Sequence, residues 1–378
     1  MPPIRGHLIR KEIGGRKSMK RNQRGSCRLL LKDFHPFPQL VTEGHVSIEP
    51  TFPVIDAHNH LTMGGYNFGK MKRTKPRIDW DHNLLLSVMD AAKVEKIVDL
   101  TPFYGEKLKA VLDFHRPHSD RIVVFGTVDF ERVDSPKFPS EVRKAIVQGF
   151  KHGMRGLKIF KELGLHYRDK NGKLVMPNDR RLKPVWDTCA ELKIPVLIHV
   201  ADPVAFFQPL DNTNERFEEL CAHPEWHFYG KGLPTFHELI QAGEELIAEN
   251  PQTTFIMAHV GWYSENLRWV SGVLDKYSNA YIDISARIAE LGRQPYTAKK
   301  FFERYQDRIV FGTDVLPNVE FYRIYYRFLE TEDEYFPYAP TPWENSQGRW
   351  RIYGLGLDKV ILRKVYRDNI LNLIDFNW

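Results

Sequence analysis

Short apolar runs alternate with amphipathic stretches through most of the chain after residue 51. Eight of these runs have the length and the β-branched content of buried strands, and stretches with a helical period separate most of them. The predicted strands are residues 54–58, 96–100, 122–128, 156–160, 195–200, 254–259, 280–285 and 308–313. The predicted helices are residues 83–92, 106–115, 140–152, 183–192, 236–250 and 265–277.

Eight strands that alternate with helices over roughly 270 residues are typical of an α/β fold of the (β/α)8 TIM-barrel type. A doubly wound open sheet is the alternative, but the sequence contains neither GxGxxG nor GxxxxGK[ST]. We therefore predict one TIM-barrel domain over residues 51–378. An N-terminal basic extension, partly irregular, is predicted over residues 1–50.

Two segments interrupt the alternation and are rich in aromatic residues. Residues 201–233 are too long for an ordinary connection, and we expect them to fold over the barrel mouth as a lid. Residues 319–356 could close the site in the same way or could bury a subunit interface, where aromatic residues and Arg are enriched. A homodimer through these insertions is therefore possible.

The net charge of +6 is unevenly distributed along the 378 residues. Residues 1–32 hold ten Lys or Arg and one Glu, which gives this segment +9 and leaves −3 for the remainder. A basic tail on an acidic body does not predict a nucleic-acid-binding face. No apolar run is long enough for a membrane helix or a secretory signal, and the three cysteines form no CxxC motif. We expect a cytoplasmic protein without nucleic-acid or membrane partners.

Polar residues with metal-binding chemistry stand at the carboxyl ends of several predicted strands. His58 and His60 end the first strand, and their spacing sends both side chains to one side. His199, His259 and Asp314 end three later strands. In a barrel these ends meet at one mouth, where imidazoles and a carboxylate would suit Zn, Mn or Fe. Taken singly, each histidine could instead be a structural residue.

Five motifs at these positions together resemble one known family. They are VIDAHNH from residue 54, GLKIF from 156, PVLIHVADP from 195, FIMAHVG from 255 and FGTDVLP from 311. Over about residues 53–375 the chain is similar to the amidohydrolase superfamily. The resemblance is to the amidohydrolase-related (amidohydrolase 2) branch, which includes aminocarboxymuconate semialdehyde decarboxylase and pyrone dicarboxylate lactonase.

The resemblance implies a single catalytic divalent metal, with zinc expected and Mn or Fe as alternatives. The implied ligands are His58, His60, His199 and Asp314. It also implies that His259 hydrogen-bonds and polarises the reacting group. Asp314 would then serve a second role as the general base that takes a proton from water.

Substrate-binding residues are less certain from the sequence. For Lys158 three roles remain open: a carboxylated ligand to a second metal, an ammonium that binds a substrate carboxylate, or a structural cation. Arg287 and Arg293 could grip a carboxylate, and Trp262 and Phe206 are expected to line the pocket. The cations of residues 70–77 could steer an anion towards the site or could belong to a solvated surface loop.

These features predict a metal-dependent hydrolase that acts on a small, carboxylated lactone, amide or ester through activated water. A non-oxidative decarboxylase of a small unsaturated or aromatic acid is the first alternative. A catalytically silent barrel that only binds metal is the second. Fold and metal ligands cannot choose among them, because barrel loops determine the chemistry.

Overall fold

The computed structural model describes residues 29–30, 33–34, 36, 38–42, 44–45, 48–67, 72–77, 80–340 and 347–376. Residues 42–378 form one compact unit, which contains every strand discussed below. Most of the predicted basic extension lies outside the described residues. So does part of the predicted cationic segment, which is described from Lys72 onward.

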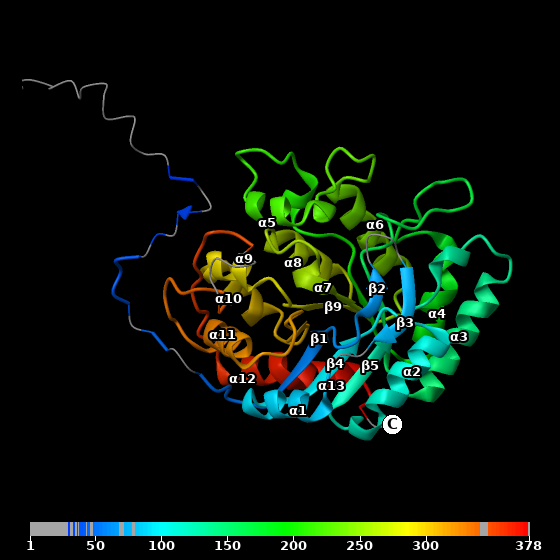
Figure 1. Ribbon diagram of the computed structural model, residues 1–378, viewed down its shortest axis with the longest axis horizontal. Coiled ribbons are helices and arrows are strands. Elements are labelled where there is room, and N and C mark those ends of the chain that lie inside the picture. Colours follow the sequence, from blue (N-terminus) through cyan, green and yellow to red (C-terminus); the bar gives the residue numbers. More distant parts are fainter. Residues whose placement is uncertain are drawn as a thin grey trace, which may run out of the picture. The chain divides into compact units, whose positions relative to one another are not determined.

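Eight parallel strands form one sheet in the order β1-β4-β5-β6-β7-β8-β9-β10 (Figure 1). The strands are β1 (Val54–Asn59), β4 (Val94–Leu100), β5 (Ile122–Gly126), β6 (Gly156–Ile159), β7 (Val196–Ile198), β8 (Phe255–Met257), β9 (Ala280–Asp283) and β10 (Ile309–Val310). Backbone hydrogen bonds join the last strand region back to the first: Ala57 donates to the Phe311 carbonyl at 2.9 Å, and Asp314 donates to the His58 carbonyl at 2.8 Å. The predicted (β/α)8 barrel is confirmed.

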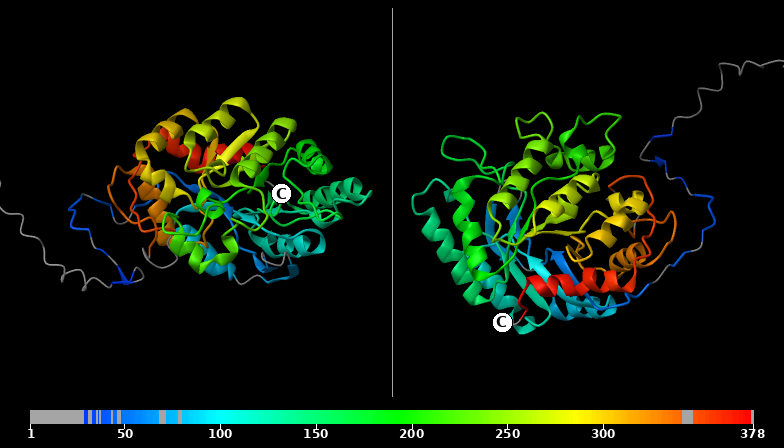
Figure 2. Two further views of the ribbon diagram at one scale, coloured as in Figure 1. Left: turned by 90° about the horizontal axis from the view of Figure 1, so that it is seen from above. Right: turned by 180° about the vertical axis from the view of Figure 1, so that it is seen from behind.

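The described helices include those that surround the sheet on its outer side and short ones at the carboxyl ends of the strands (Figure 2). They are α1 (His82–Ala91), α2 (Gly105–His115), α3 (Phe138–His152), α4 (Lys183–Leu192), α5 (Phe217–Ala222), α6 (Phe236–Glu249), α7 (Ala258–Gly261), α8 (Leu267–Lys276), α9 (Ile288–Arg293), α10 (Pro295–Arg304), α11 (Val319–Glu330), α12 (Lys359–Arg363) and α13 (Asn369–Leu373). In the described part of the chain, no helix has the length and apolarity needed to cross a membrane.

Alternation along the strands divides the apolar core into two layers. One buried cluster includes Ile55, Ala57, Val98, Leu100 and Val123, which fill the barrel interior. The other residues of the same strands, such as Val54 and Ile97, join the larger cluster between the sheet and the helices. Because both faces are buried, the strands read as continuous apolar runs, and the polar residues that end them are conspicuous.

The structure differs from the sequence-based expectation at an antiparallel hairpin after β1. Strands β2 (Gly64–Asn67) and β3 (Lys72–Arg77) occupy a segment that lacks the apolar alternation of a buried strand. Polar contacts hold the hairpin instead: Arg73 donates to the Pro102 carbonyl at 2.6 Å and to Glu162 at 2.9 Å. Tyr66 also donates to Glu162. Strands that are held by polar side-chain contacts need no alternation of apolar and polar residues, so the sequence pattern did not predict them.

The prediction that residues 319–356 form an insertion is also partly wrong, because the first third of this segment is a helix of the barrel. Helix α11 buries Tyr322, Tyr325 and Tyr326 against the barrel. Tyr322 donates a hydrogen bond to Asp56 at 2.8 Å, and Tyr326 donates to the Ala92 carbonyl at 2.8 Å. These aromatic residues therefore belong to the core and to the support of β1, and only the later part of the segment is free to line the site.

Candidate metal centre

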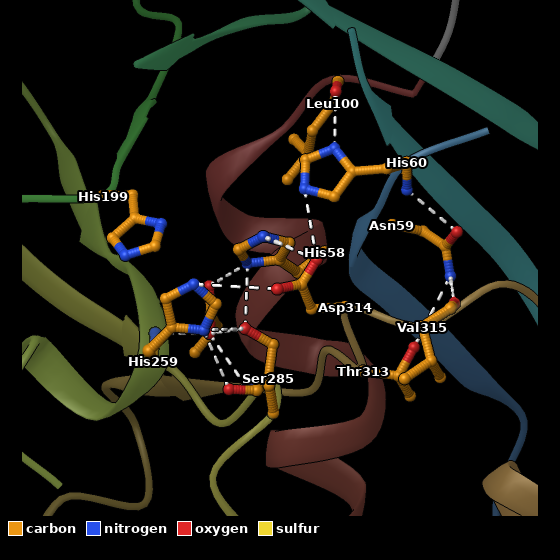
Figure 3. A network of polar contacts seen from close by, with 12 residues as sticks. His58, Asn59, His60, Leu100, His199, His259, Ser285, Thr313, Asp314 and Val315 are labelled. Atoms are coloured by element: carbon orange, nitrogen blue, oxygen red, sulfur yellow. Dashed lines mark hydrogen bonds and ion pairs between the residues drawn. The ribbon is translucent and has the colours of Figure 1, made fainter. Parts of the chain in front are cut away.

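Five of the residues predicted to form a metal site gather at the carboxyl ends of the strands. His58 and His60 come from the end of β1, and His199, His259 and Asp314 follow β7, β8 and β10. Figure 3 shows these five side chains gathered in one cluster. Asp314 Oδ1 lies 3.2 Å from Nε2 of His60 and 3.7 Å from Nε2 of His58, and Oδ2 lies 3.8 Å from Nε2 of His259.

Hydrogen bonds on the other ring nitrogen fix the tautomers of three histidines. Nδ1 of His58 lies 2.8 Å from a carboxylate oxygen of Asp283. Nδ1 of His60 lies 2.8 Å from the Leu100 carbonyl, and Nδ1 of His259 lies 2.9 Å from the Ser285 carbonyl. Because each partner only accepts hydrogen bonds, the proton is assigned to Nδ1. In the neutral rings all three Nε2 atoms therefore carry lone pairs.

Burial sets the protonation states of the cluster. It lowers the pKa of His58, with a further lowering from the Lys158 charge, and it lowers the pKa of His259 well below its usual value. Burial alone would raise the pKa of Asp314, but positive charge on the His58 and His60 rings would hold it well below the usual range. Neutral imidazoles and an ionised carboxylate are the forms that bind divalent metals.

The donor set fits a divalent cation. Single ligand atoms of His58, His60 and Asp314 all lie within 4.8 Å of one another. Nε2 of His60 and Nε2 of His259 face the partly buried Asp314 carboxylate, which is unfavourable unless a cation lies among them. The Lys158 ammonium supplies a positive charge to Nε2 of His58, at 3.2 Å. Two nitrogen donors and one oxygen donor suit Zn, Mn or Fe better than Mg or Ca. These residues could therefore hold one such ion.

His199 is placed differently from the other predicted ligands. Its ring centre is 4.4 Å from that of His259, but it is not part of the group within 4.8 Å. Nε2 is buried and forms no hydrogen bond, although Oδ1 of Asp202 lies 3.2 Å away. Lys161 holds the other oxygen of Asp202 at 2.6 Å. The role of His199 as a ligand stays a prediction, with Asp202 as its neighbour.

Left-handed backbone conformations at His259 and Asp314 direct these two side chains towards the cluster. His259 has φ 59° and Asp314 has φ 57°, and neither residue is glycine. Such conformations cost of order 1–3 kcal/mol each and persist where the surroundings impose them. The amide of His259 donates to Asp283 at 2.9 Å, and the amide of Asp314 donates to the His58 carbonyl. The chain thus turns sharply at the strand ends and presents both side chains to the cluster.

The sequence-based reasoning missed Asp283 and Ser285, which support the cluster from β9. Asp283 accepts hydrogen bonds from the amides of His259 and Ser285 and from the ring of His58. The Ser285 hydroxyl donates to Asp283 at 2.6 Å and lies within 3.0 Å of two ring nitrogens. Two polar residues at the end of an otherwise apolar strand were a signal that could have identified them.

A cavity of about 440 Å³ opens beside the cluster, and both insertions contribute to its wall. His199, His259 and Asp314 line one part of it. Phe206 and Trp226 come from residues 201–233, as the lid prediction required, and Gln347 and Arg349 come from the second insertion. Phe206 lines the cavity, and its role in binding the substrate stays a prediction.

Arg287 is a buried cation that faces this cavity. Its exposure is 7 %, and its guanidinium donates to the Ala286 carbonyl at 2.9 Å. Among the described residues no carboxylate forms an ion pair with it. Arg293, in contrast, pairs with Glu215 at 2.9 Å and stacks on Trp350. Of the two arginines, Arg287 is the one available to bind a substrate anion.

The structure corrects two of the predicted substrate-binding residues. Lys158 is fully buried and does not line the cavity, because its ammonium points at Nε2 of His58 at 3.2 Å. Burial lowers the pKa of Lys158 to about 8. Trp262 is also buried outside the cavity wall, and its indole donates to the Ile198 carbonyl at 2.9 Å. Trp262 is a packing residue, since its polar group serves the sheet.

Comparisons with known proteins bear on the family and the fold of the chain. The family model described as Amidohydrolase matches residues 55–376. The sequence matches none of the curated proteins. A 2,6-dihydroxybenzoate decarboxylase from Rhizobium is similar in structure, with a TM-score of 0.51, 16 % identity, and coverage of 85 % of this chain and 98 % of that one. An uncharacterized TIM-barrel protein from Bordetella bronchiseptica has a TM-score of 0.50, 14 % identity, and coverage of 85 % and 97 %.

Proposed function

Because this chain belongs to the amidohydrolase family, we propose that it is a metal-dependent hydrolase of a small carboxylated substrate. The observation that carries the proposal is the convergence of three Nε2 lone pairs on Asp314, beside a cavity that Arg287 lines. The substrate would be a lactone, amide or ester. The cytoplasmic location and the homodimer remain predictions.

His58, His60 and Asp314, with His199 nearby, would hold one divalent metal, and zinc is the ion we expect. When bound, such an ion acts as a Lewis acid that polarises a carbonyl and makes water nucleophilic at neutral pH. Asp314 lies at the edge of the cavity and would take the proton from the attacking water. Arg287 would bind the carboxylate and orient the scissile bond.

The tautomer of His259 changes the role proposed for it from the sequence. Its Nδ1 proton is committed to Ser285, so neutral Nε2 accepts a hydrogen bond and cannot donate one to a substrate carbonyl. Its lowered pKa disfavours the imidazolium that could donate. His259 would instead accept a hydrogen bond through Nε2, 3.8 Å from Oδ2 of Asp314, and so position the attacking water. Asp314 itself would return the proton to the leaving group.

Decarboxylation of a small planar acid is the second candidate. One observation favours it: Phe206, Trp226 and His223 stack in parallel along the cavity wall, with ring centres 6.2 and 4.0 Å apart. This wall suits a flat ring. The test is to incubate metal-loaded protein with panels of lactones, amides, esters and aromatic acids. Hydrolysis would yield a new acid without CO2, whereas decarboxylation would release CO2, and no turnover of any class would favour the silent barrel.

We expect Arg287→Ala to weaken the binding of carboxylate ligands by at least tenfold, because charge-assisted hydrogen bonds to a buried guanidinium contribute about 1.5–3 kcal/mol. Calorimetry of the metal-loaded protein with a set of mono- and dicarboxylates measures the effect. Arg293→Ala is the matched control, since that arginine is already paired with Glu215. Equal losses in the two variants, or no loss in Arg287→Ala, would contradict the assignment.

A further inference from the structure

A line of polar side chains runs from the outer helices to the segment that follows His60. Asp99 stands in β4, His115 ends α2 and His82 begins α1. Asp99 and His115 are completely buried, and His82 is half-buried. None of the three belongs to the metal cluster described above, and the proposed reaction does not use them.

At the inner end, the last two residues of β4 hold three consecutive residues of the loop. Asp99 accepts hydrogen bonds from the amide of Leu61 at 2.8 Å and from the Thr62 hydroxyl at 2.6 Å. The carbonyl of the next residue, Leu100, accepts the Nδ1 proton of His60. The orientation of the His60 ring therefore depends on the placement of this loop against β4.

At the outer end, a hydrogen bond joins two histidines. Nε2 of His82 lies 3.1 Å from Nδ1 of His115, and Nε2 of His115 lies 3.5 Å from Oδ2 of Asp99. If Nδ1 of neutral His115 carried the proton, a lone pair would face a buried carboxylate, which is unfavourable. The proton is therefore assigned to His82, which donates to His115. His115 then carries its own proton on Nε2, which is buried 3.5 Å from Asp99 without forming a hydrogen bond.

We propose that His82, His115 and Asp99 form a positioning relay for the metal ligand His60. The proposal rests on the metal centre proposed above. Nε2 of His115 lies 3.5 Å from the buried Asp99 carboxylate and stabilises its charge electrostatically, without a direct hydrogen bond. This carboxylate secures Leu61 and Thr62 beside His60.

Without His115, the buried negative charge of Asp99 is less well stabilised. We expect Asp99 then to hold the loop less firmly, so that the Nε2 lone pair of His60 is less well oriented. Replacing a residue that hydrogen-bonds directly to a metal ligand typically changes metal affinity 10–100-fold. Because His115 acts on His60 only through Asp99 and the loop, we expect an effect at the lower end of this range.

The test measures metal binding without any assay of turnover. His115→Phe keeps a buried ring but removes both nitrogens, and His115→Gln keeps one amide donor that can face Asp99. His118→Phe is the matched control, because His118 contacts His82 through its ring, at 4.5 Å between centres. The zinc dissociation constant is measured by chelator competition, and the coordination geometry by the visible spectrum of the Co²⁺-loaded protein.

We expect His115→Phe to raise the zinc dissociation constant about tenfold or more and to alter the cobalt spectrum. His115→Gln should restore much of the affinity, and His118→Phe should match wild type. If His115→Phe does not fold, His82→Phe should show a smaller loss in the same direction. Wild-type affinity and spectrum in a folded His115 or His82 variant, or an equal loss in His118→Phe, would overturn the relay alone. Absence of metal from wild type would overturn the proposed function and the relay with it.

Discussion

Replacing Asp314 with alanine is expected to weaken metal binding by at least two orders of magnitude, which is about 2.7 kcal/mol or more. Asp314 supplies the carboxylate that lies within 4 Å of Nε2 in His58, His60 and His259. Its removal deletes one donor and also the negative charge that attracts a divalent cation into a buried site. Competition with a chromophoric chelator measures the affinity of both proteins.

Asp307→Ala provides the control for this prediction. It removes the same charge from an exposed aspartate that pairs with Lys364 at 2.7 Å, and we expect unchanged metal affinity. Circular dichroism must show that both variants are folded. A folded Asp314→Ala variant that binds metal as tightly as wild type would contradict the ligand assignment.

Replacing Asp56 with alanine is expected to destabilise the barrel by about 3–5 kcal/mol. The buried Asp56 carboxylate accepts hydrogen bonds from the amide of His58, the side chain of Asn59, the amide and hydroxyl of Thr313, and the hydroxyl of Tyr322. These partners join β1 to the segment after β10 and to α11. Alanine would leave several buried donors unsatisfied at the point where the barrel closes. Urea unfolding with chelator present separates this effect from metal binding.

Tyr322→Phe is the matched variant for Asp56. It removes one of the five donors and keeps the ring, so we expect a loss of about 1 kcal/mol. Asp56→Asn should lie between the two, because the amide retains an acceptor oxygen. If Asp56→Ala lowered the free energy of unfolding no more than Tyr322→Phe, the hydrogen bonds to the Asp56 carboxylate would contribute little to the stability of the barrel. That result would contradict the prediction.

The sequence predicted the strands well because a parallel barrel buries both faces of each strand. Apolar runs therefore ended abruptly at His199, His259 and Asp314, where the chain reaches the mouth. His58 and His60 were predicted to point to one side of the chain, and in the structure both rings lie close to Asp314. These positions needed only the periodicity of the chain and the rule that strand ends converge.

Features that depend on contacts between distant segments could not be predicted in the same way. The β2–β3 hairpin is held by Arg73 and Glu162, which are 89 residues apart. At the strand ends, left-handed residues such as His259 break the alternation of side chains between the two faces. The alternation therefore could not predict which residues line the cavity, or that Trp262 and Lys158 are buried. The support of the histidines by Asp283 likewise required the three-dimensional order of the strands.

The most direct test of this account is the metal content of wild-type protein purified without added metal, measured by plasma mass spectrometry. We predict about one zinc, manganese or iron per chain, removed by a chelator and restored by the metal alone. Two metals per chain would assign Lys158 as a carboxylated bridging ligand. No bound metal, even after reconstitution, would contradict the metal centre formed by His58, His60 and Asp314.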